Sequence, residues 1–191
     1  YDRNSKLALA GPLRSQVARH SERQRLAWIS GPDLLALQAT PRGLVELWRI
    51  PAPLAVRSLV WHQDQLWVLQ QQRLLCLDAH QGSLVQEWEL PFVALDLKEV
   101  GPLLWIGGSQ GELFKVQDLR GHWLRPAGDR PCFALSASQR QAAFSRGRSL
   151  LFVDLHTARS RTLELPQPCV LPVLLGEDWA VLTSSEGMLY Q

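Results

Sequence analysis

Cysteine is scarce in the 191-residue sequence: only Cys76, Cys132 and Cys169 are present, and no two of them lie close together. An odd and scattered set excludes a framework of paired disulfides and offers no zinc-ligand spacing. An excess of one charge is also lacking, because 20 Lys and Arg face 18 Asp and Glu, for a net charge of +2. This balance excludes a polycation that binds nucleic acid through bulk phosphate neutralisation.

Long hydrophobic runs are missing as well. None approaches the roughly 20 residues that cross a bilayer, and residues 1–6 do not form a hydrophobic signal segment. We therefore expect no membrane association and a cytoplasmic location. The 46% of hydrophobic residues is enough for a single globular domain over residues 1–191 with a sizeable core, and it excludes an intrinsically disordered chain.

The sequence repeats itself with a period near 40 residues. Residues 26–51 align without gaps with residues 66–91, and nine positions are identical, including Trp48 with Trp88. Shorter copies follow, the clearest of them at residues 150–156. A period of 20–50 residues indicates a repeat fold, so this feature decides the architecture.

Each unit contains four short apolar runs separated by Gly, Pro, Gln, Asp or Ser. This pattern predicts strands and turns, and nothing long follows the 3.6-residue period of a helix. Four antiparallel strands in a unit of 36 to 40 residues make the blade of a β-propeller. We therefore predict an all-β, five-bladed β-propeller with blades at residues 14–50, 56–90, 92–126, 132–165, and 169–191 completed by 5–9.

The strands expected in the second and fourth units are 56–61, 65–70, 73–78, 83–90, 132–137, 141–145, 149–154 and 161–165. The fifth unit stops inside its third strand at residues 187–191, and residues 5–9 match the missing fourth strand. We predict that this N-terminal strand completes the last blade and closes the ring, because closure removes the exposed strand edges of an open array.

Residues 73–88 carry the clearest form of the repeat: an apolar strand that ends in Asp78, a turn that contains Gly82, and a strand that leads out through Trp88. Asp154 stands at the position of Asp78 in the fourth unit. This unit resembles the propeller repeat of the quinoprotein (PQQ-like) and WD40 families, and the resemblance covers nearly the whole chain. It implies the architecture and no cofactor, because no residues match the calcium and cofactor site of quinoprotein dehydrogenases. The Trp-Asp pair of WD40 blades is absent too.

No catalytic or metal-binding constellation stands out. Glycoside hydrolysis needs two carboxylates roughly 5 to 10 Å apart, whereas Asp96 is the single acid in the predicted inner strands. The histidines fall at equivalent positions of different blades, too far apart to bind one ion; they are His20, His62, His80 and His156. Cys132 and Cys169 each follow a proline at the start of an inner strand, and we expect them to be buried hydrophobes. We therefore predict no enzyme, no metal site and no cofactor.

Tryptophans occupy strand positions that are expected to pack one blade against the next. These are Trp28, Trp67, Trp105 and Trp179 in second strands, and Trp48, Trp88 and Trp123 in fourth strands. Trp61 is the exception by position and is a candidate surface contact together with His62.

Arginine is concentrated between residues 120 and 161, where eight arginines face two aspartates. The expected topology divides this charge, because Arg146 and Arg148 lie at the opposite end of the blade from Arg140 and Arg159. A solvated rim is the ordinary interpretation, an acidic segment of a protein partner is the functional one, and a nucleic acid is the least favoured.

From these features we predict a non-catalytic, monomeric protein-interaction module. Its partner is expected to dock on the face formed by the blade-to-blade connections and the loops between second and third strands, where prolines limit the entropy lost on binding. The candidate partner-binding residues are Arg130, Arg146, Arg148, Trp61 and Phe92. Two alternatives stay open: a propeller that binds a small ligand or carbohydrate, and the propeller part of a larger multidomain protein.

Overall fold

The computed structural model describes residues 17–20, 24–117, 120–125, 128, 130–169, 174–175, 180–183 and 189–190. Every regular element within these residues is a β-strand, so the predicted all-β class is confirmed for them. No helix there is long and apolar enough to cross a membrane. The chain divides into two compact units, Tyr1–Glu89 and Leu90–Gln191, and each has a hydrophobic core of its own.

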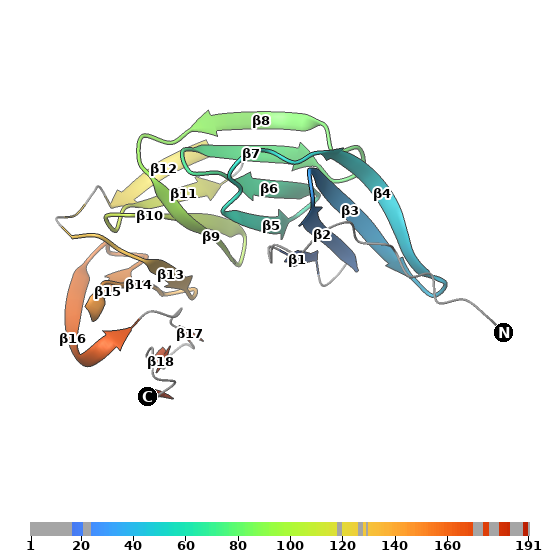
Figure 1. Ribbon diagram of the computed structural model, residues 1–191. Coiled ribbons are helices and arrows are strands. Elements are labelled where there is room, and N and C mark those ends of the chain that lie inside the picture. The colour runs from blue at the N-terminus through green and yellow to red at the C-terminus, as the bar shows by residue number, and fades with distance from the viewer. Residues whose placement is uncertain are drawn as a thin grey trace. The chain divides into compact units, whose positions relative to one another are not determined.

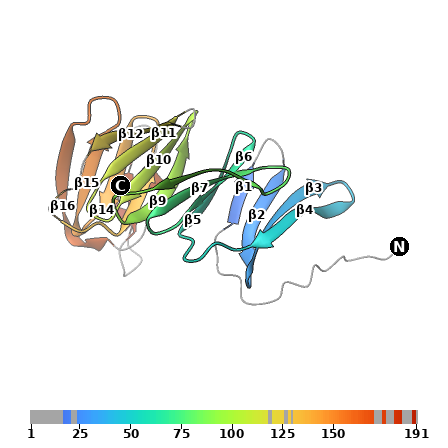
Figure 2. The ribbon, with the colours of Figure 1, turned by 90° about the horizontal axis from the view of Figure 1, so that it is seen from above.

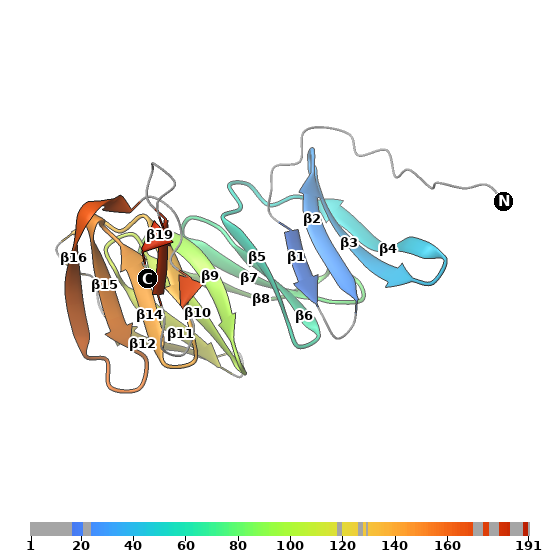
Figure 3. The same ribbon diagram turned by 90° about the horizontal axis from the view of Figure 1, so that it is seen from below.

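The first unit contains two sheets of four antiparallel strands, which we call blade one and blade two (Figures 1 and 3). Blade one consists of β1 (Val17–His20), β2 (Arg25–Ser30), β3 (Asp33–Thr40) and β4 (Gly43–Pro51). Blade two consists of β5 (Ser58–His62), β6 (Gln65–Leu69), β7 (Arg73–Asp78) and β8 (Leu84–Glu89). In both blades the strands lie side by side in chain order, and the first strands β1 and β5 contact each other.

The second unit contains two further four-stranded sheets and one of three strands. Figure 2 shows the first two, which we call blade three and blade four, beside each other. Blade three consists of β9 (Ala94–Val100), β10 (Leu103–Gly108), β11 (Leu113–Gln117) and β12 (Arg120–Arg125). Blade four consists of β13 (Ala134–Ala137), β14 (Gln141–Ser145), β15 (Gly147–Asp154) and β16 (Ser160–Cys169). The three-stranded sheet consists of β17 (Leu174–Leu175), β18 (Ala180–Thr183) and β19 (Leu189–Tyr190).

The repeat found in the sequence is also a repeat of strand register. Residues 73–78 and 141–145 are strands with the predicted bounds, and the other predicted strands of blades two and four differ only at their ends. The pairing of β3 with β4 shifts between Ala36 and Leu37, and that of β7 with β8 shifts between Cys76 and Leu77, 40 residues later. The gapless alignment therefore reflects a β-bulge that both blades carry at the same point.

Burial follows the place of each strand in its sheet. Residues 66–69 of β6 and 142–145 of β14 are buried without alternation, which is expected for strands covered on both faces. The fourth strands β8 and β16 are mostly exposed. The core therefore runs through the second and third strands, and each fourth strand forms the outer edge of its blade.

The aspartates of the repeat organise the turn between the third and fourth strands. Oδ1 of Asp78 accepts hydrogen bonds from the backbone N–H groups of His80 and Gln81, both at 2.8 Å. Oδ1 of Asp154 accepts the equivalent bonds from His156 at 2.9 Å and Thr157 at 2.8 Å. A short carboxylate that bonds the next backbone groups is a strong turn former, which explains why Asp recurs there.

The same turn needs a left-handed residue four positions after the aspartate. Gly82 has a φ of 67° and Ala158 a φ of 59°. The Gly82 N–H donates to the Asp78 carbonyl at 3.0 Å, and the Ala158 N–H donates to the Asp154 carbonyl at 2.9 Å. The two turns thus have one conformation, although only the first has the glycine that it favours.

Five closed blades are not established. The fifth sheet has three strands among the described residues, and the N-terminal strand expected at residues 5–9 lies outside them.

The strand β16 is the last strand of blade four and contains both Pro166 and Pro168.

Candidate partner-binding surface

The predicted arginines of blade four gather at one end of its sheet. Arg146 and Arg148 flank Gly147 at the turn between β14 and β15. Arg130 precedes β13, and the N–H of Phe133 donates to the carbonyl of Ser145 at 2.9 Å, which joins the start of β13 to that same turn. Antiparallel pairing therefore brings these three arginines to one end of the blade, as the sequence predicted.

The three arginines differ in how far their charge is available at the surface of the blade. Nε of Arg146 donates to Sγ of Cys132 at 3.3 Å, and its buried Nη2 has no hydrogen-bond partner among the described residues. Nη2 of Arg148 donates to the Pro166 carbonyl at 2.9 Å, although the residue is exposed. Arg130 is exposed as well. Arg130 and Arg148 are thus the two that offer charge at the surface, while Arg146 is partly engaged inside the blade.

An exposed aromatic side chain lies among these arginines and was missed in the sequence. Phe133 is 62% exposed, whereas its neighbour Cys132 is 3% exposed. Alternation along the chain at Cys132–Phe133 was the available signal, since one side chain enters the core and the next faces outward. Arginine and aromatic residues are the types that dominate binding energy in protein interfaces. We call Arg130, Phe133, Arg146 and Arg148 the loop surface.

Trp61 and Phe92, the two aromatic candidates, are core residues. Trp61 is 2% exposed and belongs to the core of the first unit. Phe92 is 6% exposed, and its ring centroid lies 6.4 Å from that of Phe114 and 5.2 Å from that of Trp123. The expected surface position of Trp61 is therefore wrong. Its side chain packs into the core between blades one and two, although it lies near the end of a first strand. Partner contact by either residue stays a prediction.

The tryptophans largely pack as expected. Trp28, Trp48, Trp67 and Trp105 are buried. Nε1 of Trp48 in blade one donates to the carbonyl of Ala79 in blade two at 3.0 Å, which joins the two blades. Trp123 departs from the pattern because it is 50% exposed, and Trp179 lies outside the described residues.

The groups considered for chemistry have ordinary partners. Oδ2 of Asp96 forms an ion pair with Nζ of Lys98 at 2.7 Å. The N–H groups of His80 and His156 bond to the turn aspartates, as local turn residues do. Among the residues that the structure describes, no three His, Cys, Asp or Glu side chains are grouped so that they could hold a metal ion.

The cysteines are free and buried, which confirms the expectation for Cys132 and Cys169. Burial, and secondarily the charge of Asp78, raises the pKa of the Cys76 thiol to about 12. A thiol of this kind stays protonated near neutrality and is a poor nucleophile.

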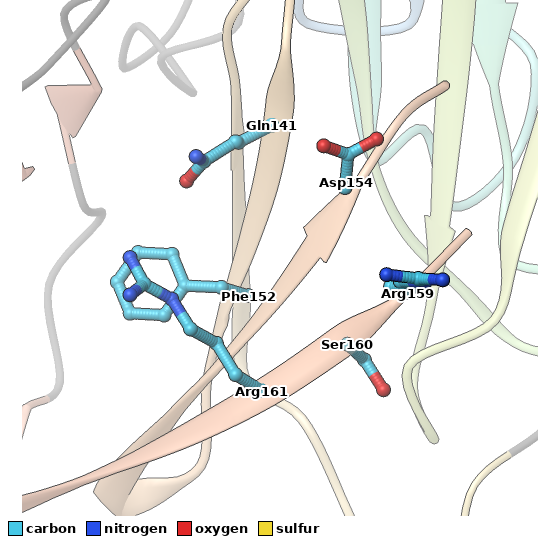
Figure 4. A pocket seen from close by; sticks show the side chains of 6 residues that line it. All are labelled: Gln141, Phe152, Asp154, Arg159, Ser160 and Arg161. Carbon is cyan, nitrogen blue, oxygen red and sulfur yellow. The ribbon is translucent and has the colours of Figure 1, made fainter. Parts of the chain in front are cut away.

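A pocket lies at the other end of blade four, away from the loop surface. Its cavity volume is about 210 Å³, and its lining comes from the start of β14, the end of β15 and the turn into β16. The lining residues are Gln141, Phe152, Asp154, Arg159, Ser160 and Arg161 (Figure 4). The sequence placed Arg159 at this end of the blade, opposite Arg146, and the antiparallel order confirms that division.

Comparisons with known proteins identify the fold. No family model and no curated protein matches the sequence. A solved S. cerevisiae complex of a Dbp5 variant bound to Nup159, a Gle1 variant, IP6 and ADP contains a chain that matches with a TM-score of 0.63 and 17% identity, over 90% of this chain and 53% of that one. BamB from Moraxella catarrhalis matches with a TM-score of 0.67 and 17% identity, over 90% and 55%.

Saccharomyces cerevisiae Sqt1 matches with a TM-score of 0.68 and 12% identity, over 87% of this chain and 55% of that one. These neighbours include PQQ-like and WD40 propellers, so the sheets described above are β-propeller blades and the resemblance seen in the sequence is confirmed at the level of fold. The chain spans about half the length of each of these three matched chains.

Proposed function

We propose that this chain is a non-catalytic protein-interaction module that docks a partner on the loop surface of blade four. One observation carries the proposal: Phe133 is 62% exposed at the same end of the blade as the exposed Arg130 and Arg148. An aromatic anchor beside arginines is the composition of an interface centre rather than of a solvated rim. The match to a chain of the Dbp5–Nup159–Gle1 complex adds support, because that structure is an assembly of proteins.

The proposed partner presents an acidic segment. Arg130 and Arg148 carry the charge opposite to that of such a segment. Guanidinium groups favour a bidentate geometry when they pair with carboxylates. The Pro166 carbonyl that accepts from Nη2 of Arg148 holds this side chain in place, so less conformational freedom is lost on binding.

The test is capture of partners from the native source by the intact protein and by a variant carrying Phe133→Ser and Arg148→Glu. Arg146 is left unchanged, because a carboxylate at its partly buried position would disturb the core. A control variant carries Leu163→Ser and Arg140→Glu, which change an exposed apolar residue and an exposed arginine elsewhere on blade four.

A partner identified by mass spectrometry that binds the intact protein and the control variant, and is lost from the loop-surface variant, is the expected result. Equal recovery by all three proteins would refute docking at this surface. Absence of any partner would redirect the search to glycans and metabolites.

We also propose that five blades close into a ring through pairing of residues 5–9 with β19. Among the described residues the fifth sheet has three strands and every other sheet has four, which supports this proposal. Deletion of residues 1–12 should then speed amide hydrogen exchange at Leu189 and Tyr190 without changing exchange in blade two. Unchanged exchange at β19 would contradict the closed ring.

A second candidate is that the chain supplies part of a longer propeller, which the half-length coverage of its structural neighbours favours. Sedimentation of the isolated chain separates the two arrangements. A monomer is expected for a closed ring, whereas self-association is expected when exposed strand edges are left unpaired.

A further inference from the structure

The pocket of blade four is built on one face of the sheet. Phe152 and Asp154 are two residues apart on β15 and so point to the same face, and the register places Arg161 opposite Phe152 and Gln141 opposite Asp154. Arg159, in the turn before β16, and Ser160, the first residue of β16, complete the lining. Arg159, Ser160 and Arg161 are exposed, so the pocket opens to the surface on their side.

One guanidinium group in this pocket, that of Arg161, is oriented by an aromatic ring. The Arg161 guanidinium carbon lies 5.1 Å from the centroid of the Phe152 ring, and Figure 4 shows the guanidinium group beside that ring. Stacking on an aromatic face orients a guanidinium group and leaves its donor edges free. Among the described residues, neither Arg159 nor Arg161 forms an ion pair with a carboxylate.

The charge of the lining selects the ligand. Two arginines and Asp154 give a net charge of +1. Asp154 remains ionised at neutral pH, because the Thr157 and His156 N–H groups hold the pKa of its carboxyl below the ordinary value. The net charge of +1 offsets one negative charge and not two, so the lining favours a carboxylate over a phosphate dianion. A cavity of about 210 Å³ is smaller than the roughly 300–1,000 Å³ of small-molecule sites, which suits one side chain.

The first unit contains the same kind of recognition between blades. Arg25 at the start of β2 is buried, and its Nη1 lies 3.8 Å from Oδ1 of Asp64, which precedes β6 in the next blade. Gln141 stands at the start of β14 as Arg25 stands at the start of β2. The propeller thus already uses this end of a blade to receive a carboxylate.

We propose that the Arg159–Arg161 pocket binds the side-chain carboxylate of an acidic peptide segment. The Arg161 guanidinium group donates to the carboxylate, Arg159 adds a positive charge to the same lining, and Asp154 accepts from a peptide N–H of the same segment. The site is separate from the loop surface and does not depend on docking there.

Two sources can supply this carboxylate. One is a partner protein. The other is the chain's own acidic sequence Glu177-Asp178, which lies outside the described residues. The experiment below includes an arm for each source.

The test measures the fluorescence anisotropy of a fluorescein-labelled hexaglutamate peptide with the intact chain and with three double variants. The pocket variant carries Arg159→Gln and Arg161→Gln. The other two carry Arg130→Gln with Arg148→Gln, and Glu177→Gln with Asp178→Asn. Loss of one charge-assisted hydrogen bond weakens binding about tenfold, so the pocket variant should bind at least roughly tenfold more weakly. The Arg130→Gln and Arg148→Gln variant removes any binding of the peptide at the loop surface, so the binding that it retains is assigned to the pocket, and failure of the two sites stays distinct.

Peptide binding by the intact chain that the pocket variant loses supports a partner as the source. Binding that arises only after Glu177→Gln and Asp178→Asn, and is lost when Arg159→Gln and Arg161→Gln are added, supports occupation by one of these two carboxylates of the chain itself. Each variant is first required to unfold at the midpoint of the intact chain, and a change in the amide NMR signal of Ser160 locates the contact.

Three results would overturn the proposal. The first is peptide binding, in the intact chain and the Glu177→Gln and Asp178→Asn variant alike, that does not depend on Arg159 and Arg161. The second is no binding by either protein. The third is displacement of the peptide by inorganic phosphate at lower concentration than by glutarate, which would assign the pocket to phosphate instead.

Discussion

The indole of Trp48 lies directly against Gly82: an ideal Cβ on Gly82 would stand 2.7 Å from Cδ2 of Trp48 and 2.8 Å from its Cε3. The same indole donates through Nε1 to the carbonyl of Ala79 at 3.0 Å. Blade one is thereby fixed to the turn of blade two by one side chain, which makes a hydrogen bond at one point and a close packing contact at another. The glycine of the repeat is needed for both the turn and this contact.

Gly82→Ala should therefore destabilise the protein through two effects. A φ of 67° costs an L-residue roughly 1–2 kcal/mol, and overpacking against Trp48 adds roughly 1–3 kcal/mol. Gly147→Ala is the matched control, because Gly147 has the same φ of 67° and nothing within 4 Å of its ideal Cβ. Urea unfolding of both variants separates the cost of the left-handed backbone from the cost of overpacking against Trp48. Equal losses of unfolding free energy would rule out the Trp48 contact as a cause.

Ala158→Gly should stabilise the protein. Ala158 has a φ of 59° at the position where the equivalent turn of blade two has Gly82. Relief of left-handed strain exceeds the entropy that glycine adds to the unfolded chain, for a net gain of about 0.5–1 kcal/mol. Ala158→Val should act in the opposite direction. Thermal unfolding of the two variants gives the sign, and a lower midpoint for Ala158→Gly would contradict the shared turn conformation.

The turn aspartates make stability depend on pH in the acid range. The N–H groups of His80 and Gln81 hold the pKa of the Asp78 carboxyl below its ordinary value. A depressed pKa contributes stability that is present above the unfolded value of about 3.9 and is lost as the pH falls through the folded value.

The free energy of unfolding of the intact chain should accordingly exceed that of Asp78→Asn by a constant amount above about pH 5, and the difference should shrink below about pH 4. Glu89→Gln, which changes an exposed carboxylate, serves as the control. A difference that is independent of pH from 2 to 7 would show that the charge of Asp78 does not support the turn.

Cys76 should resist alkylation in the folded protein. Its side chain is fully buried and the pKa of its thiol is about 12, so about one molecule in ten thousand carries the thiolate at pH 8. Iodoacetamide at pH 8, followed by peptide mass spectrometry, should leave Cys76 unmodified until denaturant is added. Rapid modification of the native chain would require that β7 opens readily.

The repeat made much of the fold predictable. Residues 73–78 and 141–145 emerged with their predicted bounds because each is an apolar run closed at both ends by turn residues. Asp78 and Asp154 were recognisable for the same reason, since a turn aspartate acts through neighbouring backbone groups and needs no distant partner. Interactions between residues that are close together in the chain can be predicted from the sequence.

The candidate site was predictable only in part. The gathering of Arg130 and Arg148 at one end follows from the antiparallel order, but the burial of Trp61 depends on the neighbouring blade that covers it. The engagement of Arg146 with Cys132 depends on side-chain placement between the turn after β14 and the segment before β13. The pocket at Arg159 and Arg161 likewise arises from strand register, which a linear pattern does not display.

The two prolines of β16 affect how the protein behaves at high concentration. Proline has no N–H, so at Pro166 and Pro168 this strand, the last of blade four, has no donor to offer to a strand from another molecule. A growing fibril needs an unbroken ladder of donors and acceptors along its template. Two missing donors so close together make β16, the longest of the described strands, a poor template for a fibril, and they protect the outer edge of blade four against aggregation.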